Sequence, residues 1–216
     1  MGELVLEQVG KAVKALSDKD HELARRVVEQ DRHVDQFDMR ADEEGLRVLA
    51  LRQPLATDLR LVLALSKSVN ELASAGNKAK KIARFSMLLT ADDLRQPNRK
   101  LLRHVCLMKE NACDMLRRSL RALSEMDVAA AVEIVKEDDE LDEEFEAGMR
   151  HLSTFMLEDS SAIRRVLDMV FVLKALERVG DHANHIAEQV IFVAEGRDVR
   201  YLSPDVLEGL EGNEAV

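Results

Sequence analysis

The chain of 216 residues contains an internal repeat that runs through nearly its whole length. At one constant offset, residues of the first half recur in order in the second half: Ala15-Leu16-Ser17 as Ala122-Leu123-Ser124, Asp20 as Asp127, Asp31 as Asp138, and Val34-Asp35 as Leu141-Asp142. Past Leu51 the halves differ slightly in length, and a second offset then matches Leu72 with Leu176, Gly76 with Gly180, and Ala79 with Ala183. Because repeated sequences fold as copies of one supersecondary unit, we expect two similar units in tandem.

Each copy has the composition of long helices. Gly and Pro number only nine and three, Trp is absent, and Ala, Leu, Glu, Lys and Arg dominate long stretches. The apolar residues Ile134, Leu141, Phe145, Leu152 and Met156 recur at spacings of three, four and seven, which is the period of a helix that packs along one face. The sequence therefore predicts an all-α fold made of two tandem three-helix bundles.

Turn residues divide the chain. We expect a first three-helix repeat at 1–92, a second at 93–202 and a flexible tail at 203–216. The predicted helices cover residues 2–16, 20–51, 54–89, 96–126, 127–157 and 160–195. Ser17-Asp18 and Ser124-Glu125 are the expected capping turns, and Gly196 is the expected C-terminal stop of the last helix.

Charge and cysteine content narrow the class of protein. The net charge of −10 argues against a nucleic-acid binder, which needs an excess of Lys and Arg. Cys106 and Cys113 lie about 10 Å apart along one predicted helix, too far for a disulfide, and fit buried thiols. No apolar run approaches the length of ~20 residues that a membrane span needs, and no secretory signal is visible at the N-terminus. We therefore expect a protein of the reducing cytosol.

Carboxylates interrupt the apolar stripes of both long second helices. Asp31 shares a face with Val27 and Val34, and Asp138 shares a face with Ile134 and Leu141. Asp35 and Asp142 each follow one turn later. An acid on a bundle-facing stripe needs a partner, because burying an unpaired carboxylate is costly.

The last helix supplies two more acids. Glu177 and Asp181 are four residues apart and project from the same face. We call Asp138, Asp142, Glu177 and Asp181 the acidic quartet. If its four carboxylates converge, they raise one another's pKa values unless a cation neutralises them, and oxygen ligands suit Mg, Mn, Fe or Zn. The alternative is salt bridging to Arg164, Arg165 or Arg178, or simple solvation.

The sequence resembles the PhoU family. The resemblance covers residues 1–202 and rests on the paired Asp-x-x-x-Asp and Glu-x-x-x-Asp motifs, on Arg52-Gln53-Pro54-Leu55-Ala56-Thr57-Asp58-Leu59-Arg60, and on Leu176-Glu177-Arg178-Val179-Gly180-Asp181. It implies a cytoplasmic, non-enzymatic negative regulator of phosphate uptake and phosphate-starvation signalling. The implied partners are the ATPase subunit of the phosphate ABC transporter and a phosphate sensor histidine kinase. Membrane association is implied only through these partners, and a homodimer is compatible with the family.

The resemblance also implies multinuclear iron or zinc clusters, with Mg or Mn as further candidates. We expect the acidic quartet of the second bundle to be the main metal site. The first bundle departs from the family pattern, because Ala73 and Asn77 occupy the positions of Glu177 and Asp181. A metal site formed by Asp31, Asp35 and Asn77 is therefore expected to be weak or lost.

Other functions remain alternatives. One is a metal-binding structural scaffold of helices, and another is a di-metal carboxylate enzyme. Such enzymes in helical bundles use Glu-x-x-His motifs, and no His of this chain has a Glu three residues before it. The sequence also lacks a Gly-rich phosphate loop and a Ser/His/Asp arrangement.

Three smaller groups of residues each allow two interpretations of their role. His182 and His185 form either a zinc pair or neighbouring surface imidazoles. The basic residues Lys78, Lys80, Lys81 and Arg84 form either a solvated face or a docking surface for an acidic partner or a membrane. The acid pairs Glu3/Glu7 and Glu110/Asp114 lie either on the surface or at the edge of a metal site.

Overall fold

Helices make up all the regular structure in the described part of the chain. The structure, a computed structural model, describes residues 1–89, 99–158 and 163–199. Its elements are α1 (Gly2–Asp18), α2 (His21–Arg52), α3 (Ala56–Leu89), α4 (Arg99–Glu125), α5 (Val128–Lys136), α6 (Asp138–Glu158) and α7 (Ile163–Glu195). None of these helices combines the length and the apolar character that crossing a membrane demands.

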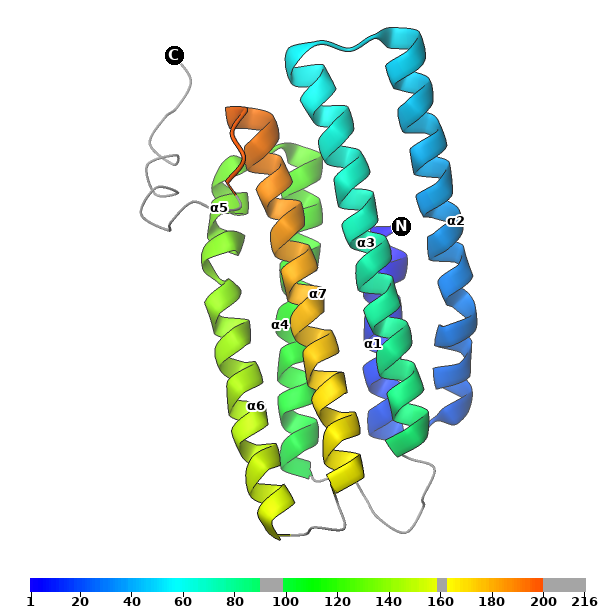
Figure 1. Cartoon of the computed structure of the whole chain (residues 1–216), viewed down its shortest axis with the longest axis vertical. Coiled ribbons are helices and arrows are strands. Elements are labelled where there is room, and N and C mark those ends of the chain that lie inside the picture. The colour runs from blue at the N-terminus through cyan, green and yellow to red at the C-terminus, as the bar shows by residue number, and fades with distance from the viewer. Residues whose placement is uncertain (90–98, 159–162, 200–216) are drawn as a thin grey trace.

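The helices form two three-helix bundles side by side, as the repeat predicts. The first bundle contains α1, α2 and α3, and the second contains α4, α7 and the consecutive pair α5 and α6 (Figure 1). The central helices α3 and α7 make the most extensive contact between any two helices. One hydrophobic core includes residues of both bundles, such as Val9, Ile82, Leu116 and Leu173. The predicted limits 1–92 and 93–202 remain predictions, and the tail at 203–216 lies outside the described residues.

The turns after α1 and α4 repeat the same geometry. Lys19 and Met126 have left-handed φ values of 55° and 54°, and each ends its helix. The next residues, Asp20 and Asp127, cap α2 and α5 by accepting hydrogen bonds from the amides of Leu23 and Ala130 at 2.8 and 3.0 Å.

The predicted capping turns at Ser17-Asp18 and Ser124-Glu125 are wrong, because these residues lie within α1 and α4. An N-cap needs extended backbone, which the chain reaches only after the left-handed residue, at Asp20. The predicted stop at Gly196 is confirmed. Its φ is 69°, and its amide donates to the carbonyl of Phe192 at 3.0 Å.

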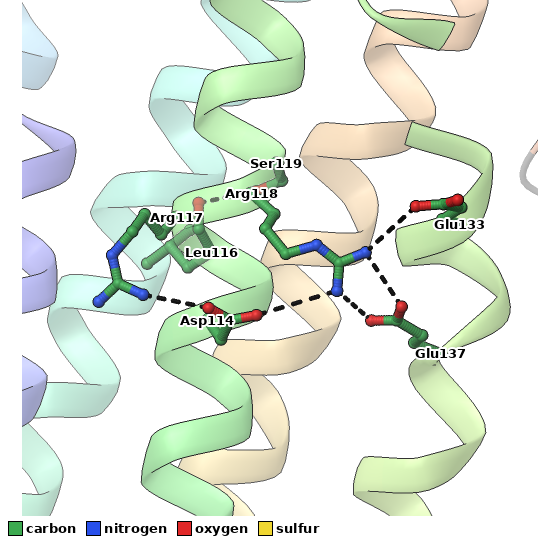
Figure 2. Close-up of polar contacts among 7 residues, drawn as sticks. All are labelled: Asp114, Leu116, Arg117, Arg118, Ser119, Glu133 and Glu137. Carbon is green, nitrogen blue, oxygen red and sulfur yellow. Dashed lines mark hydrogen bonds and ion pairs between the residues drawn. The ribbon is translucent and has the colours of Figure 1, made fainter. Parts of the chain in front are cut away.

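The predicted single helix at 127–157 is also wrong, since Glu137 separates α5 from α6. The amide of Glu140 donates to the carbonyl of Glu137 at 3.1 Å, a three-residue bond that tightens the chain. Both terminal nitrogens of Arg118 on α4 donate hydrogen bonds to Glu137, and Nη2 lies 3.0 Å from Oε1 (Figure 2). Gln30 holds the equivalent place in α2, which is continuous. The break therefore accompanies an arginine fork found in the second bundle.

Glycine sets the close approach of the second and third helices in each bundle. A Cβ atom added to Gly180 of α7 would overlap Cδ2 of Leu141 on α6. A Cβ atom added to Gly76 of α3 would lie 3.2 Å from Cγ1 of Val34 on α2. These two contacts occupy matching positions of the repeat. They bring the carboxylate-bearing segment of each second helix beside the third helix.

Replacing Gly180 by Ala tests this constraint. We expect Gly180→Ala to lower the free energy of unfolding by about 1–3 kcal/mol, since the new methyl group must displace the fully buried Leu141. Urea denaturation followed by circular dichroism measures the change.

The matched control is Gly45→Ala in α2. A Cβ atom there meets nothing within 4 Å. The helix propensity of Ala should then raise the free energy of unfolding by about 0.5–1 kcal/mol. Equal stabilisation by both substitutions would show that α6 and α7 are not held at this distance by Gly180.

Candidate metal site

Two acids of the acidic quartet lie on one side of α7 beside basic residues of the same helix. The Glu177 side chain is buried, and Lys174 binds its Oε1. Its Oε2 is also buried and has no hydrogen-bond partner among the described residues. Asp181 is partly exposed, and its Oδ2 accepts a hydrogen bond from Arg178 at 3.0 Å.

The other two acids come from α6. Asp142 is exposed, and Asp138 begins the helix with a side chain that lies outside the described residues. The contact of Leu141 with Gly180 places this segment against α7, so the structure brings the two helices of the quartet together. The donor oxygens of Asp142, Glu177 and Asp181 do not all lie within 4.8 Å of one another, and convergence of the four carboxylates on one ion remains a prediction.

Lys174 is a neighbour of the acidic quartet that the sequence analysis does not identify. Its ammonium binds Glu177 and also lies 5.2 Å from the ring centroid of Phe145 on α6. The spacing of three residues between Lys174 and Glu177 was the available signal. Of the basic partners considered as alternatives to metal, Arg178 does bind Asp181.

In the first bundle a lysine pairs with the buried acid. Asp31 is buried, with 2% of its surface exposed, and Nζ of Lys80 lies 2.6 Å from its Oδ2. Asp35 is exposed, as is Asn77, whose amide nitrogen donates to the carbonyl of Ala73 at 3.3 Å. At the position of Lys80 the second repeat has Asn184. An ammonium group therefore supplies the positive charge that the buried carboxylate needs in the first bundle.

The basic residues of α3 belong to a wider surface than the sequence indicates. Lys80 turns toward Asp31, whereas Lys78, Lys81 and Arg84 line a groove of about 580 Å³ between α3 and α7. Lys174, Arg178 and four less polar residues, Phe85, Leu88, Phe171 and Ala175, complete this groove. We call this surface the basic groove. Within it, burial lowers the pKa of Lys78, and the charges of Lys81 and Arg178 lower it further.

The remaining acid pairs fit the surface interpretation. Asp114 is exposed and lies 3.2 Å from Arg117 and 3.9 Å from Arg118. Arg118 therefore has three carboxylate neighbours, Asp114, Glu133 and Glu137 (Figure 2). Glu7 pairs with Lys11 at 2.6 Å.

Cys106 and Cys113 are free thiols, and burial raises the pKa of Cys113.

The donor set of the quartet fits a hard or borderline cation. It consists only of carboxylate oxygens, and the buried Oε2 of Glu177 retains unused lone pairs among the described residues. Lys174 and Arg178 neutralise the α7 acids in the absence of an ion. The first-bundle set offers fewer ligands, because Ala73 and Asn77 stand at the positions of Glu177 and Asp181. Asp31 itself resembles Glu177: it pairs with a lysine and keeps one buried oxygen without a hydrogen-bond partner among the described residues.

Comparison with known proteins identifies relatives over most of the chain. The family model of the PhoU domain matches residues 1–86 and 105–190, one segment in each repeat. The phosphate-specific transport system accessory protein PhoU homolog of Pseudomonas aeruginosa is 40% identical over 202 residues, covering 94% of this chain and 82% of that relative.

Two crystal structures share the fold. PhoU from Pseudomonas aeruginosa superposes with a TM-score of 0.84 at 40% identity, over 91% of this chain and 93% of that one. The phosphate transport system regulatory protein PhoU from Streptococcus pneumoniae superposes with a TM-score of 0.82 at 25% identity, over 92% and 91%.

The buried pair of Asp31 and Lys80 can be tested by a double-mutant cycle. We expect Lys80→Met to lower the free energy of unfolding by about 3 kcal/mol, because it leaves the Asp31 carboxylate buried without its partner. Asp31→Asn should cost less, and the double variant should recover most of the loss. Urea denaturation of the four proteins measures the coupling.

Lys11→Met is the matched control, because Lys11 pairs with the exposed Glu7 at the same distance of 2.6 Å. It should cost less than about 1 kcal/mol. Losses of similar size for Lys80→Met and Lys11→Met would contradict the assignment of Lys80 as the internal counter-ion.

Proposed function

The chain belongs to the PhoU family, and from this premise we propose that it is an accessory protein that regulates a phosphate-specific transport system. The observation that carries the proposal is the match of both repeats to the family model, together with similarity to an accessory protein over 94% of the chain. The superposition on two PhoU structures supports the same conclusion at the level of the fold.

The regulator works by protein–protein contact in the cytoplasm and is not an enzyme. It restrains phosphate uptake and the phosphate-starvation response when phosphate is plentiful. Its partners are the ATPase subunit of the transporter and the phosphate sensor histidine kinase, and it reaches the membrane only through them. The family relationship supports these roles, since relatives carry the names of accessory and regulatory proteins.

The basic groove is the surface on which an acidic segment of the ATPase subunit docks. Five cationic side chains gather there in a chain whose net charge is −10. Phe85 and Phe171 stack with ring centroids 5.2 Å apart, which offers apolar contact beside the charges. Such a combination of concentrated charge and aromatic surface is typical of protein interfaces.

The acidic quartet holds a metal ion that links α6 to α7 in the second bundle. The buried, unsatisfied Oε2 of Glu177 supports this role, as does the oxygen-only donor set. Iron or zinc is the expected metal by family, with Mg or Mn as further candidates. When bound, the ion supplies charge neutralisation and cross-linking rather than chemistry on a substrate. The first bundle relies on Lys80 instead.

Co-purification tests the regulatory function. Tagged protein isolated from phosphate-replete cells should recover the ATPase subunit, whereas Lys81→Glu/Arg84→Glu should reduce recovery about tenfold, because it inverts the charge of the basic groove. Quantitative immunoblotting of the ATPase measures both. Lys81 and Arg84 are exposed, so the variant should fold normally.

Arg25→Glu/Arg47→Glu is the control. It makes the same change of charge at exposed positions of α2 and should leave recovery unchanged. Failure of the wild-type protein to recover the ATPase contradicts the proposed function, whereas equal recovery by both variants contradicts only the assignment of the basic groove.

Metal analysis tests the asymmetry between bundles. Protein purified without a metal-affinity column is assayed for iron, zinc and manganese by mass spectrometry. We expect Glu177→Ala/Asp181→Ala to hold less metal per chain than the wild type, because it removes both α7 ligands of the quartet. Asp31→Ala/Asp35→Ala should hold as much as the wild type, and circular dichroism establishes that both variants are folded. Equal loss of metal from the two variants would refute asymmetric loading.

A further inference from the structure

Two histidines of the second bundle meet a glutamate of the first. Nδ1 of His182 and Nδ1 of His185, both on α7, lie 2.6 and 3.2 Å from Oε2 of Glu71 on α3. Within the described residues this is the only group of three or more His, Cys, Asp or Glu side chains whose donor atoms all lie within 4.8 Å of one another. We call it the inter-repeat cluster.

Burial in the cluster is graded from one side to the other. The exposed fraction is 13% for the His182 side chain, 28% for Glu71 and 44% for His185. The inner histidine and the glutamate are thus held by surrounding atoms, while the outer histidine borders solvent. An ion can enter from that side, and solvent there can supply a water ligand.

The electrostatics of the cluster keep the glutamate ionised. Burial by itself raises the pKa of Glu71, but hydrogen bonds from both imidazoles and their positive charge lower it to about 2. The bond to Glu71 raises the pKa of His185 against the effect of burial, and the charges of Glu188 and Asp181 add to the increase. The surroundings therefore favour positive charge between α3 and α7, which a divalent cation supplies without a proton.

We propose that Glu71, His182 and His185 form a binding site for a single divalent zinc-type ion that bridges the two repeats. Two imidazole nitrogens, one carboxylate oxygen and one water complete a tetrahedral shell of a kind that zinc adopts. In such a shell, with bonds of about 2.0–2.1 Å, neighbouring ligand atoms lie roughly 3.3 Å apart. His185 already lies at 3.2 Å from the carboxylate oxygen, and His182 has to separate from it by less than about 1 Å.

The internal repeat shows that this cluster is not part of the shared scaffold. The residues equivalent to His182 and His185 are Lys78 and Lys81, and the residue equivalent to Glu71 is Ala175. These three line the basic groove, which has no metal ligands of this kind. The equivalent positions thus bear two imidazoles and a carboxylate in one place and two lysines and an alanine in the other.

The site is distinct from the acidic quartet. Its ligands come from α3 and α7, whereas those of the quartet come from α6 and α7. It also contains imidazole nitrogens, which favour zinc over the hard cations that carboxylate oxygens prefer. A bound ion would cross-link the two bundles through their central helices, and so stabilise the folded chain over the unfolded one.

Zinc binding by the whole, chelator-treated protein tests the proposal. Zinc chloride is titrated against a chromophoric chelator, and thermal unfolding is followed with and without zinc. At a free zinc concentration a hundredfold above Kd, we expect the Tm of the wild type to rise by about 5–10 °C. Glu71→Gln and His185→Gln should each weaken zinc binding at least about tenfold and abolish most of the Tm shift. Cobalt should give the visible absorption of a tetrahedral site in the wild type and lose it in both variants.

His104→Gln is the matched control. His104 also pairs with a glutamate, with Nδ1 at 2.5 Å from Glu144, and its ring centroid lies 5.8 Å from that of His151, compared with 6.3 Å for His182 and His185. It should keep zinc affinity, the Tm shift and the cobalt spectrum. Unchanged zinc affinity in both Glu71→Gln and His185→Gln overturns the proposal, and so does equal loss of zinc from His104→Gln.

Discussion

Antiparallel packing of α3 against α7 is the contact on which the rest of the molecule depends. Specific contacts lie along the whole length. Arg60 donates to the carbonyl of Val193 at 3.2 Å near one end, Glu71 meets His182 further along, and Phe85 stacks on Phe171 toward the other end. The two bundles therefore share one core, and both the basic groove and the inter-repeat cluster exist because of this contact.

Periodicity and the internal repeat predict much of this architecture. The repeat matches Gly76 with Gly180, and the structure shows close helix approach at both, while the apolar stripes identify the buried faces of most helices. The helix break at Glu137 is not predictable in this way, because it accompanies a fork from Arg118 on another helix. Propensity along one segment carries no information about such a partner.

The same limit applies to the sites. The sequence identifies Asp31, Glu177 and Asp181 as unusual acids, but not which base each one meets. Lys80 reaches Asp31 from 49 positions away, and Glu71 meets His182 from 111 positions away. Such pairings depend on the axial register between helices, and a period of 3.6 residues fixes only the face that a helix presents. The contacts that Lys174 and Arg178 make are easier to predict, since each joins a base to an acid three residues further along the same helix.

The shared core also bears on how the chain folds during synthesis. The face of α3 that packs on α7 belongs to the first half of the chain, and its partner is made only after α4, α5 and α6. Contacts of such large sequence separation form slowly, because a long loop has to close before they contribute. A nascent first repeat thus exposes the α7-facing side of α3, including Phe85, until the last helix emerges, and transiently exposed apolar surface of this kind is what chaperones bind. Completion of α7 joins the two repeats through their shared core.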